Sequence, residues 1–148
     1  MQAGVQFSIA TETDLAAVIA CDPYAHLHSE RRALLRRAIA DSSAIAAFIH
    51  GTAVGFVVLE YNFFGTGFIP LVAVAAHVRR TGYGLALMSE AERRCTTPKL
   101  FTSTNRSNMA AQGLILKSGF EPSGRIDNID PSDPELIYFK PVSHPNDG

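Results

Sequence analysis

Two arginines and two glycines stand close together just past the middle of the chain, between an apolar stretch and a helical pattern. They are Arg79, Arg80, Gly82 and Gly84. The amino end of a helix exposes unpaired N–H groups and the positive end of the helix dipole, and glycines let an anion approach that backbone closely. Guanidinium groups add donors that suit phosphate oxygens. We therefore expect residues 79–86 to bind a phosphate or pyrophosphate. The alternative is a strand-to-helix turn that simply uses glycine, with two solvated arginines.

Two familiar glycine motifs do not fit this position. A dinucleotide-binding fingerprint needs a third glycine where Leu87 stands, and it belongs near the first strand of its domain. A P-loop ends in Gly-Lys-Ser/Thr, which does not follow here. Neither motif accounts for the predicted phosphate site.

Two motifs in the chain resemble those of the GCN5-related N-acetyltransferase (GNAT) superfamily. The acyl-CoA loop of that family, Gln/Arg-x-x-Gly-x-Gly/Ala, is matched by Arg79, Gly82 and Gly84. The strand end before it, Val72-Ala73-Val74, is also similar. A second family element, N-x-x-A-x-x-L-Y-x-K-x-G-F, is matched without its tyrosine by Asn108, Ala111, Leu114, Lys117, Gly119 and Phe120. Both motifs lie on elements in the family's order, so the resemblance covers residues from about 5 to 140.

The resemblance implies that acetyl-CoA is the co-substrate and that its pyrophosphate lies on the loop from Arg79 to Ala86. The strand ending at Val74 would splay from its neighbour and pair with the pantetheine arm like an added strand. Asn108 matches a family asparagine that contacts the cofactor, and Asn105 either shares that role or forms a turn. The full set of expected cofactor contacts is Val72, Val74, Arg79, Arg80, Thr81, Gly82, Tyr83, Gly84, Leu85, Ala86, Asn105 and Asn108.

The reaction that the resemblance implies is direct transfer of an acetyl group from the CoA thioester to a primary amine. Such a transfer needs a neutral amine, a donor for the thioester oxyanion and a proton for the leaving thiolate. The family's oxyanion donor is a backbone N–H near Val74, which requires no particular side chain. The expected acceptor is a small-molecule or peptide amine. Family members are often homodimers, so a homodimer is a further expectation.

The sequence departs from the family at its acid and base positions. Ile115 stands where the family often carries a tyrosine general acid, and Phe68 or Pro70 stands where several members carry a glutamate. Positioning alone can lower a barrier by about 7–11 kcal/mol, and a thiolate is a fairly stable leaving group. Glu60, in register with the alternate residues of its strand, is the candidate catalytic base. A solvated edge carboxylate is the alternative for Glu60.

Other titratable clusters carry weaker expectations. His26 and His28 lie where the family shapes its acceptor pocket, and they lack the third nearby ligand that a metal site needs. The acid-rich stretch 127–135 would suit a cationic amine. A dense basic segment would attract an acidic partner or simply form a solvated helix face. Its members are Arg31, Arg32, Arg36 and Arg37.

Three functions stay open at this point. The first is an acetyl-CoA-dependent N-acetyltransferase with an unidentified acceptor. The second is an acyl-CoA-binding or regulatory domain whose transfer activity is weak or lost, because the acid and base positions are apolar. The third is a nucleotide-phosphate binder without preference for CoA, which ADP and CoA would stabilise equally.

Hydrophobic periodicity predicts strands and helices in alternation along the chain. Strands are expected over 5–9, 44–49, 54–61, 68–75, 100–104, 120–126 and 136–140. Helices are expected from Thr11 to Asp22-Pro23, after Ser29, over 84–95 and around 111–118. Because helices cross between strands only in the second half, we expect an α/β fold. Its one sheet is expected to be mixed. The resemblance to the GNAT superfamily implies that this sheet is mostly antiparallel and that helices flank both of its faces.

Three local details complete this prediction. The buried face of the helix over 84–95 is expected to carry Leu85, Met88, Ala91 and Cys95. A loop is expected over 62–67. The tail from Pro141 onward, residues 141–148, lacks periodicity and is expected to fray.

Composition sets the broad class of the protein. The 148 residues are 47% hydrophobic and 18% charged, with 13 Lys and Arg against 14 Asp and Glu. This balance predicts one globular domain over 1–148 and argues against broad electrostatic binding to nucleic acid. The chain shows no membrane-length apolar stretch and no signal-peptide pattern, and Cys21 and Cys95 lack metal or redox spacing. We therefore expect a cytoplasmic protein with no bound metal.

Overall fold

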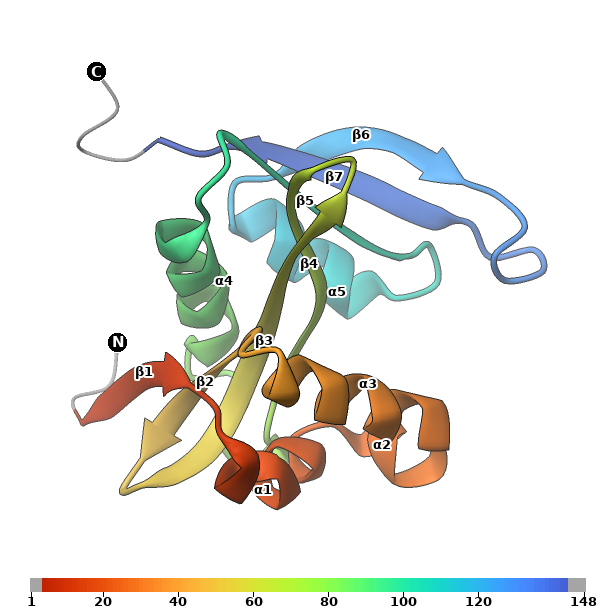
Figure 1. Cartoon of the computed structure of the whole chain (residues 1–148). Helices are drawn as coiled ribbons and strands as arrows, with labels where there is room; N and C mark the ends of the chain where they lie inside the picture. Colours follow the sequence, from red (N-terminus) through yellow and green to blue (C-terminus); the bar gives the residue numbers. More distant parts are fainter. Residues whose placement is uncertain (1–3, 144–148) are drawn as a thin grey trace. The chain divides into compact units, whose positions relative to one another are not determined.

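The computed structural model describes residues 4–143 of the chain as an α/β fold (Figure 1). In chain order its elements are β1 (Val5–Ile9), α1 (Leu15–Ala20), α2 (Pro23–Leu27), α3 (Ser29–Ala40), β2 (Ala44–Ile49), β3 (Thr52–Phe63), β4 (Thr66–Val74), α4 (Tyr83–Arg94), β5 (Lys99–Asn105), α5 (Met109–Lys117), β6 (Glu121–Ile126) and β7 (Glu135–Pro141). The strand order is β1-β2-β3-β4-β5-β7-β6. β4 and β5 pair in parallel, whereas the pairs β1–β2, β2–β3, β5–β7 and β6–β7 are antiparallel. The predicted mixed, mostly antiparallel sheet is confirmed.

The chain divides into two compact units, each made of two segments. Among the described residues, the first unit comprises 4–59 and Leu71–Ala91, and the second comprises Glu60–Pro70 and 92–143. The extent of the single domain expected over 1–148 stays a prediction.

Helices cover both faces of the sheet in the first unit. On one face, alternate residues of β2 and β3 share a core cluster with buried side chains of α1, α2 and α3. On the other face, a Cβ added to Gly55 would lie 3.1 Å from the Leu87 side chain of α4. Because successive side chains of a strand point to opposite faces, these two contacts belong to opposite sides of β3. The expectation of helices on both faces is therefore confirmed within this unit. The strand residues of the cluster include Ala44, Ala46, Phe56 and Val58.

The chain between β1 and β2 carries one more helix than the sequence analysis predicts. The first helical segment ends as expected before Asp22-Pro23, but the same two residues also begin α2. Asp22 Oδ1 accepts a hydrogen bond from the Tyr24 N–H at 3.2 Å, and proline occupies the first helical position, where its missing N–H is harmless. The buried residues of α3 are Leu35, Ala38 and Ile39.

The predicted buried face of α4 is wrong at Leu85, whose side chain is 39% exposed. The helix begins at Tyr83, and its buried stripe runs through Tyr83, Leu87, Met88 and Ala91. At 3.6 residues per turn, residue 85 lies away from this stripe. In α5, Ile115 is buried, whereas Ala111, Leu114 and Ser118 are half-buried.

The second unit differs from the prediction at the β3–β4 hairpin and at the tail. Instead of a loop over 62–67, the strands continue to Phe63 and resume at Thr66. Only Phe64 and Gly65 form the turn, both with positive φ, as a two-residue hairpin turn of the primed type requires. Fraying from residue 141 is also wrong, because β7 includes Pro141 and the Val142 N–H donates to Pro98 O at 2.9 Å. The rest of the expected tail, 144–148, lies outside the described residues.

Candidate functional site

The predicted phosphate loop lies in the first unit, between the end of β4 and the start of α4. After a 3-10 turn at Ala76–Val78, the chain reverses through Arg80 and Gly82, whose φ angles are +65° and +90°. The hydroxyl of Thr81 donates to the carbonyl of Val78 and closes this turn. A Cβ on Gly82 would meet nothing within 4 Å, so the glycine serves the backbone conformation and leaves the space above it open.

The amino end of α4 supplies the donors of this loop. The first backbone bond of the helix joins the Ala86 N–H to Gly82 O at 3.0 Å. The N–H groups of Tyr83, Gly84 and Leu85 precede that bond, so they belong to the first turn, whose donors have no partner within a helix. α4 is 12 residues long, and its dipole places positive potential at this end.

The side chains of the loop differ in what they can contribute. Arg79, Arg80 and Thr81 are exposed, and the Nε of Arg79 donates to Val74 O at 3.1 Å, which ties the arginine to the end of β4. Tyr83 is only 3% exposed, so its ring belongs to the core and its backbone alone faces the loop. Val72 and Val74 are half-buried in β4. The predicted residues from Val72 to Ala86 thus run from the end of β4 through the loop into the first turn of α4.

Asn105 and Asn108 lie in the second unit, and both amides have partners there. Asn105 Nδ2 donates to Asp130 Oδ2 at 2.8 Å. Asn108 Oδ1 accepts from the Ala111 N–H at 3.1 Å and caps α5. These bonds account for both residues structurally, and their cofactor contacts stay predictions.

The predicted base and the substituted acid positions also lie in the second unit. Glu60 is half-buried and its Oε2 accepts from Asn62 Nδ2 at 3.0 Å. Ile115 is 3% exposed, so an apolar side chain at this position is favoured by packing in the core. Phe68 stacks on Phe63 with ring centroids 4.8 Å apart. The catalytic role of Glu60 stays a prediction.

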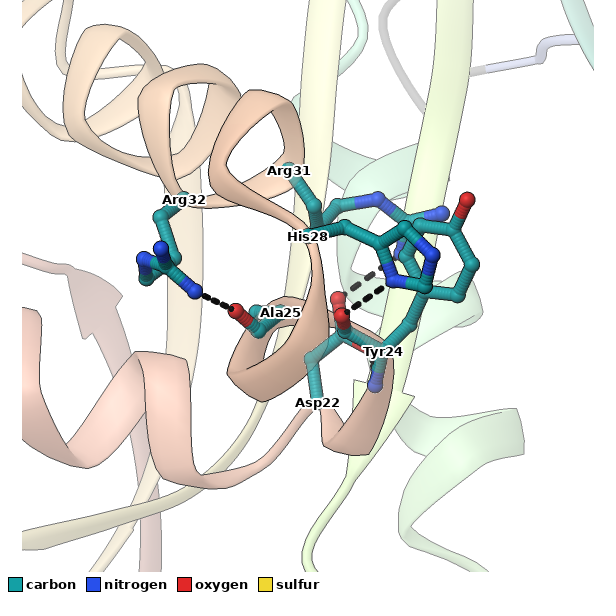
Figure 2. Close-up of polar contacts among 6 residues, drawn as sticks. All are labelled: Asp22, Tyr24, Ala25, His28, Arg31 and Arg32. Atoms are coloured by element: carbon teal, nitrogen blue, oxygen red, sulfur yellow. Dashed lines mark hydrogen bonds and ion pairs between the residues drawn. The ribbon is translucent and has the colours of Figure 1, made fainter.

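Sequence reasoning missed a side-chain cluster at α2 and α3 (Figure 2). The ring of His28 stacks on Tyr24 at 3.6 Å and 4°, and the Arg31 guanidinium carbon lies 4.4 Å from the centre of the Tyr24 ring. Arg31 also forms an ion pair of 2.8 Å with the buried carboxylate of Asp22. Arg32 donates to Ala25 O at 2.6 Å.

The interpretation of a fully solvated arginine face is therefore wrong for Arg31 and Arg32, and it holds for the exposed Arg36 and Arg37. The signal lay in the spacing of Tyr24 and His28, which are four residues apart.

The acidic stretch 127–135 is tied to the turn before α5. Asp133 accepts from the hydroxyl of Ser107 at 2.6 Å and from its N–H at 3.0 Å. Asp130 accepts from Asn105, and Asp127 pairs with Arg125 at 3.2 Å. These three carboxylates therefore position the loop, and their use for a cationic acceptor stays a prediction.

Both cysteines lie among the described residues, are buried, and form no disulfide. Burial raises the pKa of the Cys21 thiol from 9.0 to about 11, the nearby Asp22 carboxylate adds to this rise, and a hydrogen bond with the Ala75 backbone opposes it. The Cys21 Sγ–H donates to Ala17 O at 3.2 Å. A thiol held neutral in this way is a poor nucleophile.

Within residues 4–143, no three His, Cys, Asp or Glu side chains gather where they could share a metal ion. None of the helices in the same range has the length and hydropathy needed to cross a membrane.

Comparison with known proteins gives both a family and structural relatives. Residues 13–120 match the Acetyltransferase (GNAT) family. A GNAT-family acetyltransferase from Bacillus cereus is similar in structure, with a TM-score of 0.86 and 28% identity over 95% of this chain and 99% of that one. No curated protein matches the sequence.

Two more distant structures share the fold. One is yncA from Salmonella typhimurium with its cofactor acetyl-CoA, at a TM-score of 0.72 and 16% identity over 95% of each chain. The other is the ribosomal-protein-S18-alanine N-acetyltransferase from Escherichia coli, at a TM-score of 0.70 and 20% identity over 97% of each chain.

Proposed function

Because this chain belongs to the Acetyltransferase (GNAT) family, we propose that it transfers the acetyl group of acetyl-CoA directly to a primary amine. The observation that carries the proposal is the loop from Arg79 to Ala86, where an open, left-handed Gly82 leads into the amino end of α4. Such a backbone suits a pyrophosphate, and the sequence of the loop matches the family's acyl-CoA motif.

We propose that the segment from Val72 to Ala86 binds acetyl-CoA. The N–H groups of Tyr83, Gly84 and Leu85 would hold the pyrophosphate, with Arg79 and Arg80 adding charge. The β4–β5 ladder ends at the pair Ile69↔Thr102, and β4 continues to Val74 beyond it. The acetyl-CoA bound by the Salmonella relative supports the choice of cofactor.

The chemical step would depend on positioning and backbone donors. A backbone N–H near Val74 would stabilise the thioester oxyanion, and this needs no special side chain. Attack of the amine nitrogen on the thioester carbon forms the amide and expels the CoA thiolate, and Glu60 is the carboxylate that we propose for removing the amine proton. Ile115 cannot donate a proton, so the thiolate would be protonated by water.

The acceptor that we propose is a small-molecule or peptide amine. The E. coli relative is named for acting on an alanine of a ribosomal protein, which supports a peptide amine as one member of this class. A cytoplasmic location and a homodimer are further proposals that rest on the family resemblance.

The test of the cofactor is thermal unfolding of the purified protein with acetyl-CoA, with ADP and with NAD. A ligand that binds only the native state adds about 2.7 kcal/mol of stability when its concentration is 100 times its Kd. We expect acetyl-CoA to raise the Tm more than ADP or NAD does. Equal shifts with ADP would favour a general nucleotide-phosphate site, and no shift at saturating acetyl-CoA would refute the proposal.

A second candidate function is an acyl-CoA-binding or regulatory domain with weak transfer. The observation that favours it is the apolar character of Phe68, Pro70 and Ile115 at the family's acid and base positions. Release of CoA thiol in the presence of a panel of amines and peptides separates the two functions. Acetyl-CoA binding without amine-dependent thiol release would support the regulatory domain.

A further inference from the structure

The second unit contains a pocket that the proposed acetyl transfer does not use. Its volume is about 610 Å³, within the range of about 300–1,000 Å³ typical of small-molecule sites. The β3–β4 hairpin, the start of β5, and strands β6 and β7 form its walls. The residues that line it are Phe63, Phe64, Thr66, Lys99, Phe101, Ser123, Gly124, Arg125, Ile126 and Ile137.

Phenylalanine rings form the apolar side of this pocket. The sheet register aligns Phe68, Phe101 and Phe139 across three neighbouring strands, so their side chains lie on one face. Phe63 lies against two of these rings, with centroid separations of 4.8 Å to Phe68 and 5.2 Å to Phe101. The chain of rings continues to Phe139 at 5.3 Å. Of these rings, Phe63 and Phe101 line the pocket, and both side chains are only half-buried, so part of their aromatic surface is open to a ligand.

The helices of the second unit pack on the opposite face of its sheet. Lys140, which pairs with Leu100 in the register, points to that face, and its Nζ bonds to Ser118 O just after α5 and to Glu92 at the end of α4. Leu100 itself is fully buried, in contrast to its half-buried neighbour Phe101. The described helices of this unit therefore leave the phenylalanine side uncovered.

A β-bulge in β6 shapes the polar wall of the pocket. Pro122 pairs with Tyr138 and Arg125 with Leu136, so two residues, Ser123 and Gly124, lie opposite the single Ile137. A bulge leaves the extra residue outside the ladder, and its backbone is then available to other partners. Ser123, Gly124 and Ile137 all line the pocket.

The two charged residues that line the pocket are both cationic. Lys99 and Arg125 line it, and the set contains no Asp or Glu, although acids slightly outnumber bases in the whole chain. Arg125 pairs with Asp127 at 3.2 Å, and both side chains are more than half exposed. The ammonium of Lys99 has no ion pair among the described residues. An apolar pocket with an uncompensated cation at its edge is complementary to an amphipathic anion.

We propose that this pocket binds a small aromatic carboxylate. The ring would stack against Phe63 and Phe101, since offset and edge-to-face aromatic contacts are favourable at these separations. The carboxylate would pair with Lys99, whose charge-assisted hydrogen bond is stronger than a neutral one. The ligand site lies apart from the Val72–Ala86 segment in the chain and does not depend on the acetyl-transfer proposal.

The experiment is a calorimetric titration of the full chain with indole-3-acetate and with its neutral analogue indole-3-acetamide. Because both probes present the same ring, the ratio of their Kd values isolates the contribution of charge. We expect the carboxylate to bind about tenfold more tightly than the amide, and we expect this preference to shrink as salt is raised. Equal Kd values, or no binding of either probe, would overturn the proposal.

Two matched pairs of variants assign the site. Lys99→Met should remove the preference for the carboxylate, whereas Lys117→Met, which changes an exposed lysine outside the pocket, should keep it. Ser123→Trp should fill the pocket and weaken both probes about tenfold or more, while Pro122→Trp, on a neighbouring exposed residue that does not line it, should not. Unchanged binding in Lys99→Met and Ser123→Trp would refute this site. A Kd that rises with protein concentration would show that a second copy fills the pocket, which would also refute it.

Discussion

The two binding regions that we propose for this chain are built in opposite ways. The loop from Arg79 to Ala86 is one continuous segment of the first unit, and it offers backbone N–H groups and a left-handed turn. The phenylalanine pocket of the second unit takes its residues from the β3–β4 hairpin and from β5, β6 and β7, and it offers side chains. A site made of backbone is sensitive to φ and to added bulk, whereas a site made of side chains is sensitive to their identity.

The largest effect is expected from Gly82→Glu in the phosphate loop. A carboxylate there would oppose the pyrophosphate and occupy the open space above a φ of +90°, so affinity for acetyl-CoA should fall on the order of 100-fold or more. Gly51→Glu is the matched control, because Gly51 also has positive φ and open space but lies in the β2–β3 turn. Calorimetric titration with acetyl-CoA measures both. Similar affinities for the two variants would contradict a backbone phosphate site.

The stability of the protein should depend on pH in the alkaline range because of Cys21, which is buried in the first unit. Its folded pKa is raised by burial to about 11, so between pH 9 and 11 the unfolded chain loses the thiol proton while the folded chain keeps it. The free energy of unfolding should therefore fall as pH rises through this window, by on the order of 2–3 kcal/mol.

Urea unfolding of the wild type and Cys21→Ala at pH 8 and pH 11 checks this expectation. The variant is less stable at both values because it leaves a cavity, but it should lack the thiol's share of the alkaline loss. An equal loss in the two proteins would show that Cys21 does not contribute.

Smaller changes in stability are expected from two glycine-to-alanine substitutions in the second unit, one limited by tertiary packing and one by helix propensity. A Cβ at Gly67 would lie 2.5 Å from Cys95 Sγ and 3.2 Å from Leu100, so Gly67→Ala should destabilise the protein by about 1–3 kcal/mol. Gly113 lies inside α5 with nothing within 4 Å, and Gly113→Ala should stabilise by about 0.5–1 kcal/mol. Chemical denaturation measures both changes. Shifts of the same sign would mean that the packing around Gly67 adapts freely.

The elements that sequence analysis predicted best are those whose signal is local. The strands Val5–Ile9 and Ala44–Ile49 have the predicted bounds, and α3 begins at Ser29 next to the predicted start. Alternation and helical spacing depend on a few neighbouring residues, so they can be recognised in the sequence without knowledge of the tertiary contacts. The GNAT fold also followed from two short motifs in the right order.

The errors lie where distant residues decide. Leu85 had the spacing of a buried residue, but α4 packs into the core through Tyr83, Leu87, Met88 and Ala91, which leaves Leu85 on its exposed side. A loop was predicted over 62–67, but β3 and β4 pair up to a two-residue turn, so that most of these residues belong to the strands. Arg31 belonged to a basic run, yet it pairs with the buried Asp22 nine residues earlier. Each outcome depends on contacts that no local pattern records.

The sequence by itself determined the family, the order of the strands and the glycine loop, because these depend on residue types at short, fixed spacings. Only the tertiary structure decided the stack of Tyr24 on His28, the buried environment of Cys21 and the pocket of the second unit. Its rings come from Phe63 and Phe101, which sequence separates by more than thirty residues and strand pairing brings together. Burial and long-range register are properties of the folded chain, so they appear only once the strands have paired.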